Sequence, residues 1–219
     1  MPHIEVSETI IRLLCFLPLF IISITVHEFA HAIVAYRFGD NTAKSQGRMT
    51  LNPLKHIDVV GTLIMPLLSF TSGFALIGWA KPVPIDRSKF RDPIKNDLLV
   101  SAAGPLSNML LAVVILAVLM VLHFMHVHPQ GMVGQIFVYA VYLNVFLCLF
   151  NLLPLPPLDG AHILFDLFPN EYTARYLGMG LIGSLVLLLA INTPVFGYFM
   201  TLVNGVTVFL FNMYEAIHG

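Results

Sequence analysis

The chain has 219 residues, of which 58% are hydrophobic and only 11% are charged, and its mean hydropathy is +0.85. A soluble domain of this length needs far more polar surface, so the composition excludes a soluble protein and predicts a single all-α domain, 1–219, embedded in a membrane. The formal net charge is −1, which gives no reason to expect a nucleic-acid partner.

Residues 8–38 are predicted to form the first long membrane helix, which contains the sequence HEFAH. His27 and His31 are four residues apart, so they lie on the same helix face and can bind one metal ion. Glu28 stands beside the first histidine, where a glutamate can act as a general base on water. Two interior histidines and a glutamate bonded to a neighbouring helix would give the same pattern. Ionisable residues inside a membrane are costly and usually functional, which favours the metal site.

Two polar loops, 37–57 and 80–95, contain nine of the eleven Lys and Arg residues. The positive-inside tendency predicts that both lie on the cytoplasmic side of the membrane. The apolar segment 59–79 between them must then enter the membrane and return, and Pro66 and Gly73 interrupt it near its middle. A sixth spanning helix, kinked at Pro66, is the alternative.

Four further apolar segments complete a predicted fold of five to six transmembrane helices. Residues 97–124 and 133–153 form two helices joined by a short polar turn, and residues 176–192 and 195–216 form a hairpin.

The sequence NLLPLPPLDG, residues 151–160, offers a third metal ligand in Asp159. Its three prolines exclude an ordinary helix, and Asp159–Gly160 is predicted to form a turn. Irregular backbone at membrane depth normally lines a cavity, so an acid there can reach a metal held by the first helix. A capping or turn aspartate at the membrane surface is the other interpretation. The predicted topology places Asp159 near the same membrane face as the second half of the first helix, which supports the metal site.

Three motifs together resemble the site-2 protease family of intramembrane zinc metalloproteases: HEFAH at 27–31, GPLSN at 104–108 and NLLPLPPLDG at 151–160. The chain looks like the compact bacterial and archaeal type, without a PDZ or CBS domain. One departure concerns the residues after Asp159–Gly160, where many members carry Gly/Ser-Arg and this chain has Ala161–His162. The departure concerns the surroundings of the ligands and leaves the ligands themselves intact.

The resemblance implies that His27, His31 and Asp159 bind one Zn²⁺ ion and that Glu28 is the catalytic base. It also implies four residues that contact or position the substrate: Asn151, Gly104, Pro105 and Asn108.

The expected function is therefore hydrolysis of peptide bonds in transmembrane proteins or peptides. The protein is expected in the cell membrane of a prokaryote, with the active site nearer the cytoplasmic face. The alternative is a zinc-binding membrane protein without proteolysis, either a transporter, a sensor or an inactive scaffold. A transporter would need additional polar residues along its helices, and the sequence has few. Histidine and carboxylate ligands also suit divalent ions other than zinc.

Overall fold

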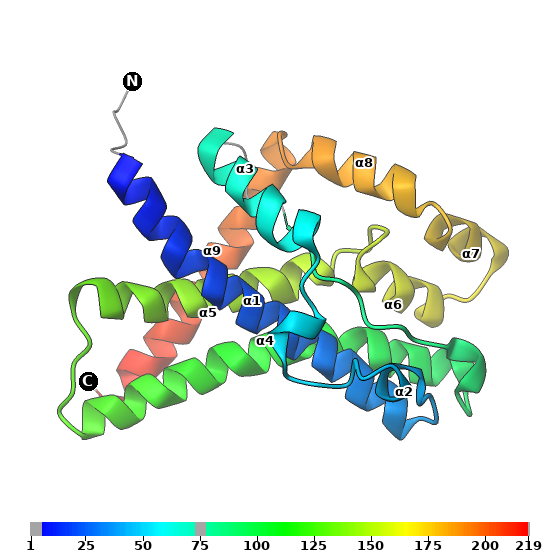
Figure 1. Ribbon diagram of the computed structural model, residues 1–219, viewed down its shortest axis with the longest axis horizontal. Helices are drawn as coiled ribbons and strands as arrows, with labels where there is room; N and C mark the ends of the chain where they lie inside the picture. The colour runs from blue at the N-terminus through cyan, green and yellow to red at the C-terminus, as the bar shows by residue number, and fades with distance from the viewer. Residues whose placement is uncertain (1–5, 73–77, 219) are drawn as a thin grey trace.

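The computed structural model describes residues 6–72 and 78–218, and within these residues it is helical and contains no β-strand (Figure 1). The long helices are α1 (Val6–Arg37), α4 (Pro93–Phe124), α5 (Gly131–Asn151) and α9 (Pro194–His218). The shorter ones are α2 (Thr42–Ser45), α3 (Met65–Ser72), α6 (Asp159–Leu167), α7 (Glu171–Leu177) and α8 (Gly180–Ala190), with a π-helix at Val59–Ile64 and 3-10 turns at Pro53–Lys55 and Arg87–Lys89.

Four of these helices are long and apolar enough to cross a membrane: Cys15–Arg37 of α1, Pro93–Phe124, Gly131–Asn151 and Pro194–Ile217. The pair α7 and α8 could form a fifth span, but it is bent by 70° at its break. The predicted all-α membrane fold is confirmed. The continuous helix predicted for 176–192 is wrong in one respect, because the chain breaks between Leu177 and Gly180.

Helix α4 is the central helix of the fold and contacts α1, α5, α6 and α9. Its first turn is capped by Asp92, whose side chain accepts a hydrogen bond from the backbone N–H of Lys95. Fully buried small residues then allow close packing of α4 against α5 and α9, among them Ala112, Val141 and Val203. A second apolar cluster joins α1 to α5. The two clusters pack α4 and α1 against α5, and α1 also contacts α4 directly.

The segment 59–79 returns to its starting point. Val59–Ser69 forms a short apolar helical stretch of about 17 Å, well below the ~30 Å thickness of the hydrocarbon core. Trp79 then donates its backbone N–H to the carbonyl oxygen of Gly61 over 3.1 Å, and its indole packs where a side chain at position 61 would stand. Because a spanning helix would separate these residues widely, the contact fits the predicted re-entrant segment and contradicts the kinked spanning helix. Gly73 lies outside the described residues.

Helix α6 begins at Asp159, so the turn predicted at Asp159–Gly160 is wrong. The prolines do break the chain after α5, and the residues between Asn151 and Asp159 are irregular. Beyond Pro157, however, nothing opposes a helix, and an aspartate in the first turn is favoured by the helix dipole.

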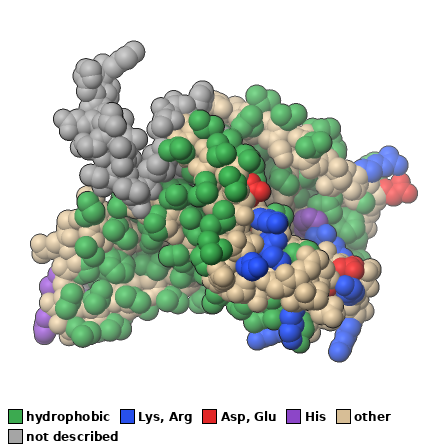
Figure 2. All heavy atoms as spheres, viewed as in Figure 1, with side chains coloured by type: hydrophobic (Ala, Val, Ile, Leu, Met, Phe, Trp, Pro, Cys, Tyr) green, Lys and Arg blue, Asp and Glu red, His purple; other side chains and the backbone are tan. Residues whose placement is uncertain are grey.

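Lysine and arginine side chains gather at one end of the molecule (Figure 2). In that view they lie around α2 and the beginning of α4, whereas hydrophobic side chains cover much of the remaining face. The molecule thus has a polar, basic end and an apolar body.

Candidate metal centre

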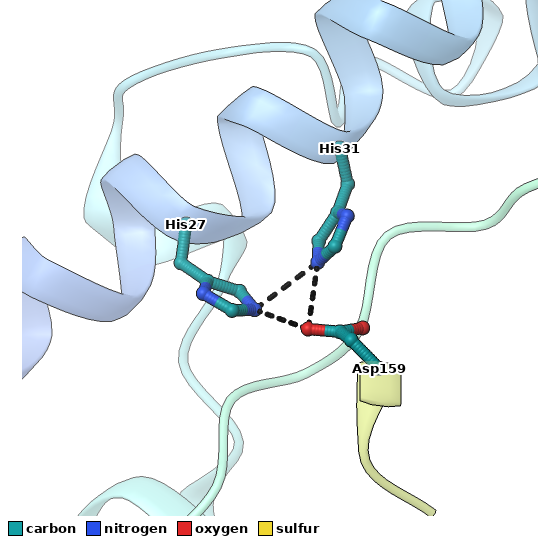
Figure 3. Close-up of side chains that lie close together, drawn as sticks. All are labelled: His27, His31 and Asp159. Atoms are coloured by element: carbon teal, nitrogen blue, oxygen red, sulfur yellow. Dashed lines mark hydrogen bonds and ion pairs between the residues drawn. The ribbon is translucent and has the colours of Figure 1, made fainter. Parts of the chain in front are cut away.

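His27 and His31 lie one turn apart on α1, and both are buried. Their Nε2 atoms are 3.1 Å apart and point toward the same position (Figure 3). Asp159 reaches this position from the beginning of α6, with its Oδ2 atom 3.2 Å from His27 Nε2 and 3.4 Å from His31 Nε2. Residues 27 and 159 thus meet in space as the sequence analysis predicted.

The three ligand atoms have the spacing of a tetrahedral zinc site. Zinc lies about 2.0–2.2 Å from nitrogen and oxygen ligands, so two tetrahedral ligands are roughly 3.3 Å apart. The observed separations of 3.1–3.4 Å match this value. Asp159 Oδ2 is also buried without a hydrogen-bond donor among the described residues. His27, His31 and Asp159 could therefore hold one zinc ion and leave its fourth position open.

The Asp159 carboxyl is suited to bind a cation because it is ionised. Burial opposes this ionisation, but the positive charge of the neighbouring His31 holds the pKa of the Asp159 carboxyl well below its ordinary value.

Helix α4 orients both histidine rings through their second nitrogen atoms. His27 Nδ1 is 2.7 Å from Oδ1 of Asn108, and His31 Nδ1 is 2.7 Å from the carbonyl oxygen of Val100. Both acceptors require a proton on Nδ1, which leaves each Nε2 free to bind a metal.

Asn108 belongs to a buried amide network and has no exposed surface. Its side-chain nitrogen donates to the carbonyl of Ser23 on α1 and to Oδ1 of Asn144 on α5. The side-chain nitrogen of Asn144 in turn donates to the carbonyl of Ala140. The structure thus places Asn108 behind His27, between three helices.

Gly104 leaves the space in which the ligand atoms meet. A Cβ atom at this position would lie 2.6 Å from Nε2 of His27 and closer still to Nε2 of His31. Its neighbour Pro105 is fully buried inside α4. The glycine of GPLSN therefore has a steric reason to lack a side chain, independent of any contact with substrate.

Glu28 is buried and is held by the extended segment that crosses the site. Its Oε2 accepts a hydrogen bond of 2.7 Å from the backbone N–H of Val83. The bond orients the carboxylate. The carbonyls of Lys81 and Pro82, immediately before Val83, accept hydrogen bonds from Arg48, which fixes this segment in turn.

Asn151 is the last residue of α5 and is partly buried. Its side chain donates to the carbonyl of Leu147 in its own helix, and no hydrogen bond joins it to His27, His31 or Asp159 in the part of the chain that the structure describes.

Sequence reasoning missed three supporting groups: the carbonyl of Val100, the N–H of Val83 and the amide of Asn144. The first two belong to the backbone, which any residue type supplies, so no pattern could indicate them. Asn144 did carry a signal, since an amide in the middle of an apolar helix needs a buried partner.

A model of peptidase family M50 matches residues 15–129 and 124–191 of the chain. This chain belongs to peptidase family M50, the site-2 protease family. Its M50 relatives include a Bacillus subtilis (strain 168) protein named "Putative zinc metalloprotease YwhC", which is 45% identical over 182 residues, 81% of this chain and 80% of that protein. A Mycobacterium tuberculosis (strain ATCC 25618 / H37Rv) protein named "Putative zinc metalloprotease Rip2" is 35% identical over 141 residues, 64% of this chain and 52% of that protein.

The chain thus spans about half the length of the mycobacterial relative. No solved structure matched it. The family and the ligand geometry confirm the predicted metalloprotease class and the zinc cofactor.

Proposed function

We propose that this M50 protein hydrolyses peptide bonds of transmembrane proteins or peptides inside the membrane. The observation that carries the proposal is the depth of the site: two ligands and Glu28 are buried in α1, within the apolar span Cys15–Arg37. A protease for soluble substrates would not need to place these costly groups within a membrane helix.

Glu28 is the proposed general base. Zinc, when bound, lowers the pKa of water toward neutrality and stabilises negative charge on a carbonyl oxygen. Glu28 accepts the proton of the attacking water and delivers it to the leaving amine. Its hydrogen bond from Val83 keeps the carboxylate in one orientation while it exchanges the proton.

Asn151 is proposed to contact the substrate, because it ends α5 at the irregular segment that leads to Asp159. For Asn108, by contrast, complete burial and its bond to His27 support a positioning role. Gly104, next to the ligand atoms, and the adjacent buried Pro105 are proposed to shape the wall of the site. The substrate itself must unwind locally, since an intact helix engages its carbonyls in hydrogen bonds.

The test compares wild type with Glu28→Gln, using Glu215→Gln as the control because Glu215 is exposed near the end of α9. Each protein is purified in detergent, analysed for bound zinc and incubated with transmembrane peptides. We expect equal zinc in all three and cleavage by wild type and the control only, with a loss of at least about 10²-fold in Glu28→Gln. Equal cleavage by Glu28→Gln would refute the base assignment. Zinc flux into vesicles without cleavage would favour a transporter.

A further inference from the structure

Four positions on α4 follow one another along the face that meets the metal centre. Asp97, Val100, Gly104 and Asn108 are spaced by three, four and four residues, so they form one stripe on the helix. Val100 and Asn108 bind the two histidine rings, and Gly104 lies beside their Nε2 atoms. Asp97, at the beginning of the stripe, is also buried, but it does not contact a histidine ligand. Its partner is Arg87.

Arg87 connects α4 to α6. Its Nε atom lies 2.5 Å from Oδ2 of Asp97, and its Nη2 atom lies 2.9 Å from Nδ1 and 3.3 Å from Nε2 of His162. His162 Nδ1 is itself 3.7 Å from Oδ2 of Asp97. The Asp97 side chain is only 4% exposed, so this carboxylate is paired in a largely dry environment. A planar guanidinium can hold two partners at once in fixed directions.

His162 lies three residues after Asp159, on the adjacent turn of the same helix. The chain between Asn151 and Asp159 is irregular, so α5 does not continue into α6 as one helix. A link from the next turn of α6 to α4 therefore bears directly on where the Asp159 carboxylate stands. The same helix, α4, already orients the other two ligands.

We propose that Arg87, Asp97 and His162 form a bridge that positions the zinc ligand Asp159 relative to His27 and His31. The three are positioning residues, and the proposal rests on the proposed zinc-dependent function. The stripe on α4 then orients all three ligands: His31 through Val100, His27 through Asn108, and Asp159 through the bridge. Loss of the bridge leaves the histidine pair in place and lets α6 carry its carboxylate away from them.

The experiment measures zinc affinity by competition with a chromophoric chelator, and kcat and KM separately, for Arg87→Gln, His162→Leu and the double variant. The matched controls are Arg91→Gln, an exposed arginine of the same loop, and His128→Leu, an exposed histidine beyond α4. We expect each single variant to bind zinc at least about tenfold more weakly than its control. We expect kcat to fall with KM within about twofold, because the bridge does not contact substrate. The double variant should bind zinc as tightly as the single variant with the lower zinc affinity, since both changes break the same bridge.

Zinc affinity in either variant equal to that of its control would overturn the proposal, as would additive losses in the double variant. Arg87→Lys provides a second test where Arg87→Gln does not give a monodisperse protein. The lysine of Arg87→Lys keeps a positive charge beside Asp97 but lacks the planar guanidinium that contacts two partners. The zinc affinity of this variant should therefore lie between those of wild type and His162→Leu. Zinc binding is measured without substrate. A wild type that binds zinc but cleaves no peptide would therefore refute the proposed protease function, while the zinc affinities of the variants would still test the bridge.

Discussion

At the scale of single residues, Asn108 is a fully buried side chain that forms a hydrogen bond with His27. Its Oδ1 accepts the Nδ1 proton of His27, and its nitrogen is fully used by Ser23 and Asn144. Replacing Asn108 with Leu keeps the volume but leaves buried polar atoms of His27 and Asn144 without partners. We expect zinc affinity to fall about 10- to 100-fold and the free energy of unfolding to fall by roughly 1–3 kcal/mol. Chelator competition and thermal unfolding measure the two effects.

Asn192→Leu is the control for that variant, because Asn192 is exposed and bonds only within its own turn among the described residues. Asn108→Asp retains an acceptor for His27 and should lose less affinity than Asn108→Leu. Equal zinc affinity in Asn108→Leu and wild type would show that α1 alone orients the His27 ring.

Gly104 gives a second residue-scale prediction. The methyl group of Gly104→Ala would stand against the two Nε2 atoms and occupy the space where the ligands meet. Gly197→Ala in α9 is a matched control, because a Cβ atom there meets nothing within 4 Å. Helix propensity alone would stabilise both variants by up to about 1 kcal/mol. We therefore expect zinc content, measured by elemental analysis, to fall below detection in Gly104→Ala and to stay at one per chain in Gly197→Ala. Full zinc content in Gly104→Ala would place the metal elsewhere.

The sequence was sufficient to predict that His27, His31 and Asp159 come together, because each has a side chain with metal chemistry at an informative position. The pairing of His27 and His31 follows from helix geometry. Asp159 was predicted from an acid at a proline break together with the predicted topology and the family resemblance. The positions of Arg87 and Asp97 were not predictable, because the contact between them depends on how a loop folds over α4. Glu28 was predicted to be the base, but its hydrogen bond from Val83 was not predicted, since a backbone N–H has no sequence signature.

At the scale of elements, α6 combines a metal ligand with a buried acid. Asp166 is 6% exposed, and neither of its carboxylate oxygens has a hydrogen-bond partner among the described residues. Burial and the negative charge of Asp97 raise its pKa from the ordinary value of 3.8 to about 7, although Arg87 opposes the shift. We therefore expect the folded protein to keep a proton on Asp166 up to about pH 7, whereas the unfolded chain releases it near pH 4.

This difference makes stability depend on pH. Between about pH 4 and pH 7 the folded state binds more protons than the unfolded state, so the free energy of unfolding decreases as the pH rises. Below this window both states are protonated, and above it the folded state carries an unpaired buried charge. Asp166→Asn removes the ionisation, so its unfolding midpoint should change less between pH 5 and pH 8 than that of wild type. The stability difference at pH 8 should be on the order of a few kcal/mol in favour of the variant.

Thermal unfolding of the zinc-loaded proteins at the two pH values measures this effect. Glu171→Gln on α7 is the control, since its side chain is 86% exposed. A wild-type midpoint that rises from pH 5 to pH 8 relative to Asp166→Asn would contradict the predicted direction.

Among the elements, the re-entrant segment was predictable from the sequence, whereas helix α6 was not. The re-entrant segment followed from two basic loops that must share one side, and the Trp79–Gly61 contact agrees with it. Helix α6 was not expected, because the prolines before Asp159 dominated the interpretation of that stretch. Its nine residues are too few to be stable alone, and packing against α4 makes them helical.

At the scale of the whole molecule, the basic end predicts an orientation in the membrane. Helix α4 has 32 residues and is about 48 Å long, more than the ~30 Å hydrocarbon core, so its two ends lie on opposite sides of a membrane. The loops near its beginning contain nine Lys and Arg residues, whereas the turn after its end, 125–130, contains none. From the positive-inside tendency we expect the beginning of α4 and Asp159 to lie nearer the cytoplasmic side.

Single cysteines test this orientation in intact cells. Ser45→Cys in α2 and His128→Cys in the turn after α4 are both at exposed positions, and Cys15→Ala with Cys148→Ala supplies the background. We expect a membrane-impermeant maleimide to label His128→Cys at once and Ser45→Cys only after permeabilisation. The opposite pattern would place the basic loops outside the cell. We do not expect that pattern, because moving about nine positive charges across the membrane is costly. If the protein cleaves transmembrane peptides as proposed, that pattern would also place the cleavage nearer the external face.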